Sequence, residues 1–520
     1  MGIILAMMGV FYAAVIYVLY RTLQTTDPDF DEYAVGGRRY GPAFIGMSYV
    51  QSWFPGAMFV AFFGISASIG VLGFYCLAYS LLGLCMMYFM ANRAWRWGQR
   101  YDLRSQPDLL GKRYDSHAVK QVASVIGIVS ILPWVIIGMQ ALGLLFRVAS
   151  GYSWATTVCL LAGLVVILVR QYWTVRMGMR GLIMTDMLQG SVAYLVAGLV
   201  CIIILAGGKG SAAPYSNFAH LPIALLRVPG DGGTYGPLYM FSLIFMGTIG
   251  ALAWPMSFQR IYTAKGVRAV KTGTVYAVAI AGFFYAMLTL VAIAAATIPQ
   301  VMADPQGGWF VVVDKFGGTW LLGLACVCVL GAGMGHVDGC VQVAGIQIAN
   351  DLINRRSRPL SSHQLTVVAK TSMMCFMGIA GVLAYVTFNM GRLQLLAQMS
   401  YYGIIQLSVP LFLGIFWRRG NKYAALAGML TGFPLAIILT IWWDDDIRGL
   451  ASLTAGMVAL AANLAVFLIV AAVTGRSDEE KARVSRLFDE TRVVSGALAP
   501  ATAPVAVLTN EGLGEAAVKS

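Results

Sequence analysis

Residues 42–68 read PAFIGMSYVQSWFPGAMFVAFFGISAS, an apolar stretch interrupted near its middle by Pro55 and Gly56. It is long enough to cross a bilayer, which takes about 20 residues of helix, but proline and glycine both disfavour a continuous helix. A later apolar stretch, residues 237–258, contains glycines and ends near Pro255. Interrupted spans at corresponding positions of two halves are typical of broken helices that meet at a central binding site.

Composition places the whole chain in the membrane class. The 520 residues are 59% hydrophobic and 11% charged, whereas soluble domains carry about 25% charged residues. Hydropathy predicts an all-α polytopic membrane protein with thirteen transmembrane helices. The predicted spans are 2–20, 42–68, 72–91, 121–148, 154–169, 182–206, 237–258, 273–297, 319–350, 367–387, 394–416, 423–441 and 451–474.

The two interrupted spans divide the chain into repeats. We expect a first five-helix repeat over residues 42–206 and an inverted second repeat over 237–416. One extra helix precedes the repeats and two follow them. The remaining segments are an N-terminal helix and inner loop (1–41), an outer loop (207–236), two C-terminal helices (417–474) and a largely disordered cytoplasmic tail (475–520).

The basic residues predict the orientation, because Lys and Arg concentrate in cytoplasmic loops. With the N-terminus outside and the C-terminus inside, 30 of the 36 Lys and Arg lie on the cytoplasmic side. This accounts for the net charge of +13 without a nucleic-acid partner. The eight cysteines all fall in apolar spans, where packing is their ordinary role. The first span lacks the features of a cleaved signal peptide.

Several short motifs resemble those of the sodium:solute symporter family, which includes sodium-glucose, proline and pantothenate carriers. They are DEYAVGGR at 31–38, SWFPGA at 52–57, GLIMTDMLQ at 181–189, QR at 259–260 and NDL at 350–352. The resemblance extends over roughly residues 30–475, with the motifs in the family's order. It implies a LeuT-type inverted-repeat fold (5+5 helices), alternating access, and a solute site midway through the bilayer.

The resemblance also implies a set of solute-binding positions on three spans. On the alternative interpretation, the aromatic residues among them serve ordinary packing or lie in an interfacial belt. We expect no intramembrane Arg or Lys in the pocket, so that backbone N–H groups and helix-end dipoles would hold an anion. The implied solute-binding residues are Gln51, Ser52, Trp53, Phe54, Pro55, Trp134, Gly247, Ala251 and Pro255.

The implied ion site departs from the family pattern. In sodium-coupled members, backbone carbonyls coordinate sodium together with two adjacent hydroxyls, and the carbonyls here would come from Gln51, Phe54 and Ala332. The hydroxyl positions are Gly335 and His336, neither of which has a hydroxyl. Two interpretations follow. Either sodium still binds, with a nearby carboxylate or water replacing the hydroxyls, or a titratable group replaces the ion and transport is proton-driven or uncoupled.

Two aspartates lie inside the predicted spans, where charge is costly. Asp338 is two residues from His336, so on a regular helix the two side chains point about 200° apart. Ion or proton coupling competes here with a structural role for Asp338, beside small residues that let helices approach closely. Asp186 matches the family's acid on an ion exit path, and the alternative is a carboxylate paired with Arg176 or Arg180.

The sequence therefore predicts a symporter rather than an enzyme. The expected solute is a small polar organic molecule such as a monocarboxylate, an amino acid or a vitamin-like acid, moved across the cytoplasmic membrane by alternating access and coupled to Na⁺ or H⁺. We expect no other cofactor, no nucleic acid and no obligatory protein partner, with lipid as the surrounding medium. The alternatives are a membrane solute sensor and an uncoupled facilitator on the same fold.

Overall fold

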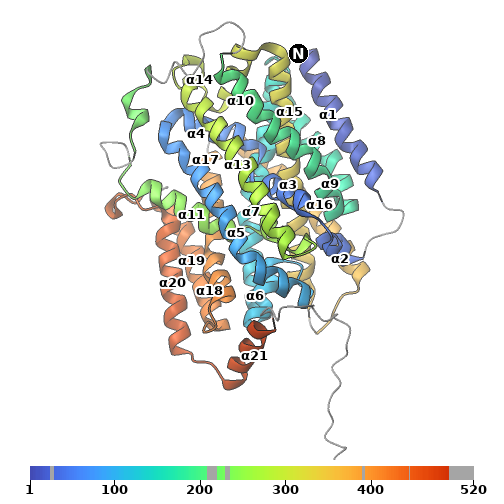
Figure 1. Cartoon of the computed structure of the whole chain (residues 1–520), viewed down its shortest axis with the longest axis vertical. Helices are drawn as coiled ribbons and strands as arrows, with labels where there is room; N and C mark the ends of the chain where they lie inside the picture. Colours follow the sequence, from blue (N-terminus) through green and yellow to red (C-terminus); the bar gives the residue numbers. More distant parts are fainter. Residues whose placement is uncertain are drawn as a thin grey trace, which may run out of the picture.

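The computed structural model describes residues 1–23, 29–207, 220–228, 235–355, 357–388, 393–443 and 446–490. Across these residues the chain is helical, and its only β pairing consists of three isolated bridges. The helices form one elongated bundle (Figure 1). Helix α1 begins at the end of the bundle that carries α14, and α21 lies at the opposite end. Most of the expected outer loop (208–219 and 229–234) and the tail from 491 lie outside the described residues.

The first half of the chain forms helices α1 to α10. Their bounds are α1 Gly2–Thr22, α2 Phe30–Val35, α3 Pro42–Trp53, α4 Ala61–Ile69, α5 Tyr75–Arg100, α6 Gln106–Tyr114, α7 His117–Ala149, α8 Thr156–Met177, α9 Met179–Gly190 and α10 Ala197–Leu205. Short 3₁₀ segments are η1 Gly36–Arg38, η2 Gly56–Phe59 and η3 Gly70–Phe74, and η4 Ser191–Val196 is a π-helical turn.

The second half forms helices α11 to α21. Their bounds are α11 Tyr239–Ala253, α12 Pro255–Thr263, α13 Val267–Ala295, α14 Pro299–Ala303, α15 Gly308–Gln347, α16 Ser362–Thr387, α17 Leu393–Ile404, α18 Ser408–Phe416, α19 Lys422–Trp443, α20 Ala455–Val473 and α21 Asp478–Asp489. Shorter segments are η6 Ile223–Leu226, η7 Pro305–Gly307, the π-helical η8 Ile348–Ile353, η10 Ile405–Leu407 and η11 Arg448–Leu450.

Twelve segments of the described residues are long and apolar enough to cross a membrane. One of them, Gly56–Arg100, turns back at Gly70, whose φ of +63° suits glycine because it has no Cβ. The all-helical membrane architecture is therefore as predicted. The total of thirteen spans and the two-repeat layout stay predictions.

Both predicted interruptions are present. Helix α3 ends at Trp53, and Phe54 (φ −113°, ψ 97°) and Pro55 (φ −70°, ψ 159°) are extended before η2 begins. The later span breaks at Trp254 (φ −67°, ψ 113°), between α11 and α12. Each break frees backbone groups from the helical hydrogen-bond pattern.

Helix α15 runs through the centre of the bundle and contacts both α3 and α7. Every residue from Ala325 to Gln347 is buried. Glycines allow this close packing: a Cβ on Gly56 would lie 2.7 Å from the Val329 carbonyl oxygen on α15. The centre of the molecule is thus where α15 passes the break between α3 and η2.

Helix α21 packs on the C-terminal end of α5. Phe488 contacts the Trp97 ring at 5.4 Å between centroids, and the Trp97 indole nitrogen donates to the Leu487 carbonyl. The Trp95 indole donates to the Ala264 carbonyl. Both tryptophans lie beyond residue 91, where the third predicted span ends, but α5 continues to Arg100 and both are buried.

Candidate solute and ion site

A series of cavities leads from the α14 end of the bundle toward the two breaks. The outermost is lined in part by Tyr235, Tyr239, Pro305 and Gln306. It shares lining residues with a middle cavity, which in turn shares Trp134 with an innermost one. The innermost cavity is lined by Trp53, Pro55, Met58, Tyr79, Trp134, Trp254, His336 and Tyr401.

Aromatic rings from five helices form the walls of the inner cavities. Trp134 on α7 lies 5.8 Å from Tyr401 and 6.2 Å from Trp254, measured between ring centroids. Trp254 sits at one break, and Trp53, 6.5 Å from it, ends α3 at the other. The two breaks therefore approach each other through their aromatic residues.

Trp134 also has a free polar atom. Its indole Nε1 is buried and has no hydrogen-bond partner among the described residues. An unpaired buried donor costs free energy unless a ligand or water satisfies it. Because Trp134 lines two of the cavities, its N–H is available to an acceptor on a bound solute.

The predicted solute residues fall into two groups. Trp53, Pro55, Trp134 and Gly247 line cavities. The other five lie in packed or hydrogen-bonded positions: Gln51 and Ser52 bond within the α3–α15 region, Phe54 packs on rings of α13 and η4, and Ala251 and Pro255 are buried against α5 and α7. Tyr79, Tyr401 and Trp254 line the cavities and were not among the predicted solute residues.

The carbonyl oxygens around the α3 break accept hydrogen bonds from protein side chains. Gln51 Nε2 donates to the Gly331 carbonyl at 2.8 Å. The Tyr194 hydroxyl donates to the Phe54 carbonyl. Ser52 and Ser257 place their hydroxyl oxygens 3.3 Å apart, which links α3 to α12. The break is thus hydrogen-bonded by its own surroundings.

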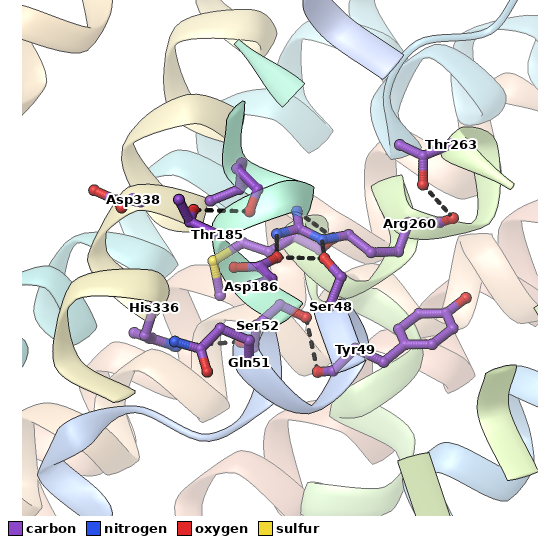
Figure 2. Close-up of polar contacts among 12 residues, drawn as sticks. Ser48, Tyr49, Gln51, Ser52, Thr185, Asp186, Arg260, Thr263, His336 and Asp338 are labelled. Carbon is purple, nitrogen blue, oxygen red and sulfur yellow. Dashed lines mark hydrogen bonds and ion pairs between the residues drawn. The ribbon is translucent and has the colours of Figure 1, made fainter. Parts of the chain in front are cut away.

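His336 faces the same break. Its Nδ1 lies 3.1 Å from the Ser52 carbonyl oxygen, and its Nε2 lies 3.6 Å from Cys340 Sγ. A carbonyl only accepts, so Nδ1 carries the proton in this arrangement. Asp338 points elsewhere, toward α8, as the helical geometry predicted (Figure 2).

No Arg or Lys lines these cavities in the described part of the chain, but the spans themselves contain buried arginines. Arg170 and Arg260 are both buried within the spans, because α8 continues to Met177 and α12 to Thr263, beyond the predicted ends at 169 and 258. Hydropathy ended each span at its first charged residue.

Asp338 pairs with Arg170. Their side chains approach to 2.6 Å, and Gln171 Nε2 donates to the other carboxylate oxygen at 2.7 Å. Arg170 also donates to Thr174 on its own helix and to Thr185 on α9. The pair therefore connects α8, α9 and α15.

Asp186 pairs with Arg260, at 3.6 Å, rather than with Arg176 or Arg180. The Ser48 hydroxyl lies between them: it donates to Asp186 and accepts from Arg260 Nε at 2.9 Å (Figure 2). Residues from α3, α9 and α12 thus meet at one buried cluster. In the described residues, three or more His, Cys, Asp or Glu do not gather as a metal site would require.

The sodium:solute symporter family model matches residues 33–432. The chain belongs to this family. Its relatives include the sodium/pantothenate symporter of Escherichia coli (strain K12), which is 21% identical and aligns with 80% of this chain and 86% of its own length. The osmoregulated proline transporter OpuE of Bacillus subtilis (strain 168) is 24% identical, over 93% of this chain and 97% of its own.

Solved structures show the same fold. A Na⁺-coupled sialic acid symporter, solved substrate-bound and outward-open, aligns with a TM-score of 0.74 at 17% identity, covering 91% of this chain and 97% of that one. The structural neighbours are LeuT-fold transporters. The family and its neighbours are transporters rather than enzymes. They support Na⁺ as the coupling ion and a small molecule as the substrate. They also identify this chain as an integral membrane protein.

Proposed function

We propose that this chain is a secondary transporter that moves a small organic solute across the cytoplasmic membrane by alternating access. The observation that carries the proposal is the series of cavities that ends between the two helix breaks, at Trp53 and Trp254. Broken helices at mid-depth supply polar backbone groups to a solute that has lost its water. The charge distribution supports an external N-terminus, so that the cavities open to the outside.

The lining supports a compact solute with an apolar body and one strong acceptor group. Aromatic rings surround the inner cavities, and among the described residues the Trp134 N–H and the Tyr402 hydroxyl are donors there without a partner. Monocarboxylates, amino acids and vitamin-like acids carry such a group. The buried arginines of the spans are already paired with Asp338 and Asp186, so the carboxylate of a solute would bind neutral donors.

Uptake by reconstituted protein tests this function. Purified protein in proteoliposomes is offered labelled monocarboxylates, amino acids and vitamin-like acids under sodium, proton or no ion gradient. Concentration of one solute above its external level supports a coupled symporter. Equilibration without accumulation indicates a facilitator, and no uptake of any solute contradicts transport.

Trp134→Phe sharpens the test because it keeps the ring and removes only the N–H. We expect KM for the solute to rise about tenfold, the effect of losing one hydrogen bond to a charged group, with little change in folded yield. Trp320→Phe is the matched control, since Trp320 is 67% exposed on the outside of the bundle. An unchanged KM in Trp134→Phe would remove this indole from solute binding.

A further inference from the structure

We propose that side chains of this protein take the place of a coupling cation where the broken span α3–η2 meets α15, so that its transport cycle runs without sodium. The inference rests on the proposed function and deepens it, because it concerns the driving ion at the same site. Its principal test measures ion binding, so it can fail or succeed whether or not a transported solute is found.

A cation held at a helix break needs oxygen atoms with free lone pairs directed at it, because they replace its hydration shell. Around this break the carbonyl oxygens are directed at donors instead. The Gly331 carbonyl accepts from Gln51, the Ser52 carbonyl from His336 and the Phe54 carbonyl from Tyr194. Three different helical segments thus deliver N–H or O–H groups to carbonyls at this junction, and the Phe54 carbonyl is one of those expected to coordinate sodium.

The space between α3 and α15 is also taken. A Cβ added to Gly335 would lie 1.9 Å from Gln51 Nε2. The Gln51 amide therefore fills the volume that a side chain at 335 would occupy. Glycine at 335 and glutamine at 51 fit together as a pair, and a hydroxyl-bearing residue at 335 would collide with the amide.

Positive charge is built into the same region. Arg170 approaches Asp338 to 2.6 Å and Arg260 approaches Asp186 to 3.6 Å. Each of these two buried carboxylates therefore already has a positively charged arginine side chain as its counter-ion. The second carboxylate oxygen of Asp186 and the Gln51 Oε1 have no partner among the described residues. Because Asp186 already faces the Arg260 guanidinium, its free oxygen is better suited to an ordered water than to a mobile cation.

Sodium binding to the purified protein tests the proposal directly. Thermal unfolding in detergent is followed in sodium, potassium and choline chloride at equal ionic strength, alongside equilibrium binding of ²²Na⁺. We expect the same Tm in all three salts and no saturable ²²Na⁺ binding. A saturable, sodium-specific rise in Tm, or saturable binding of the isotope, would overturn the proposal.

Variants that remove the donors supply the converse test. His336→Ser combined with Gln51→Ala and Gly335→Ser frees the Gly331 and Ser52 carbonyls and adds two hydroxyls. We expect this variant to gain a saturable sodium-dependent rise in Tm of about 1–3 °C, as expected when a ligand binds only the folded state. Gln140→Ala is the matched control, because Gln140 caps the Ala384 carbonyl on another helix pair. A folded triple variant that responds no more than this control would contradict the idea that these side chains stand in for a cation.

Uptake provides a third measurement once a solute is known. Accumulation by the parent should be equal with sodium or choline outside. Sodium-dependent accumulation would overturn the inference while leaving the transport function intact, and an absence of uptake in every salt would contradict the function but not the binding result.

Discussion

The two buried acid–arginine pairs differ in how tightly they are held. Asp338 and Arg170 approach to 2.6 Å, and Gln171 occupies the remaining carboxylate oxygen. Asp186 and Arg260 are 3.6 Å apart, share the Ser48 hydroxyl, and leave one Asp186 oxygen without a described partner. In the first pair both carboxylate oxygens have partners on α8, so the pair holds α8 and α15 together. The second joins α12, the C-terminal part of a broken span, to α3 and α9, where the proposed alternating access requires relative motion.

Breaking the tight pair should have the largest effect. Asp338→Asn leaves the Arg170 charge buried without a counter-ion, which costs about 3–5 kcal/mol. We expect a strongly lowered Tm and reduced folded yield, measured by thermal unfolding and size-exclusion chromatography in detergent.

The control for this prediction neutralises both partners. Asp338→Asn with Arg170→Gln should recover at least half of the lost stability, because no buried charge remains unpaired. If the single and double variants were equally unstable, the cost would come from packing rather than from charge.

Breaking the looser pair should cost less stability and affect transport more. Arg260 lies 3.6 Å from Asp186, against 2.6 Å between Arg170 and Asp338, so Asp186→Asn gives up a weaker pairing and we expect a loss of about 1–3 kcal/mol. Uptake per folded molecule should fall in this variant, since the cluster joins the segments that must separate. A stability loss as large as that of Asp338→Asn would remove the distinction between the two pairs.

The smallest effect is expected from the hydroxyl that bridges the looser pair. Ser48→Ala should cost about 1 kcal/mol, the value of a buried hydrogen bond, and should slow uptake. Ser408→Ala removes a comparable buried hydroxyl that donates to the Ile249 carbonyl. Equal changes in uptake rate for the two variants would show that the Ser48 bridge has no special role in transport.

Much of the fold follows from local sequence. Pro55, Gly56 and Pro255 predict the two breaks because both residue types disfavour a continuous helix. The spacing of His336 and Asp338 predicts that they face opposite sides of α15, since helical geometry fixes their directions. Long-range partners are a different matter: nothing local indicates that Arg170 reaches Asp338, 168 positions away in numbering.

The site was predicted in part for the same reason. Residues adjacent to the breaks, such as Trp53 and Pro55, line the cavities because the break itself places them there. Tyr79 and Tyr401 lie on helices away from the two breaks, so their aromatic side chains look like ordinary packing until the helices are assembled. Arg170 and Arg260 were missed because the hydropathy criterion ended each predicted span just before its first charged residue.

The sequence by itself determined the membrane class, the places where helices break and the absence of hydroxyls at Gly335 and His336. These are properties of single residues and their immediate neighbours. Only the tertiary structure decided what fills the gap at the α3 break, because Gln51, Tyr194 and His336 come from segments far apart in the chain and meet only when α3, η4 and α15 pack together. Hydrogen bonds and charges are satisfied in three dimensions, so the partner of a buried polar group is fixed by packing rather than by its place in the chain.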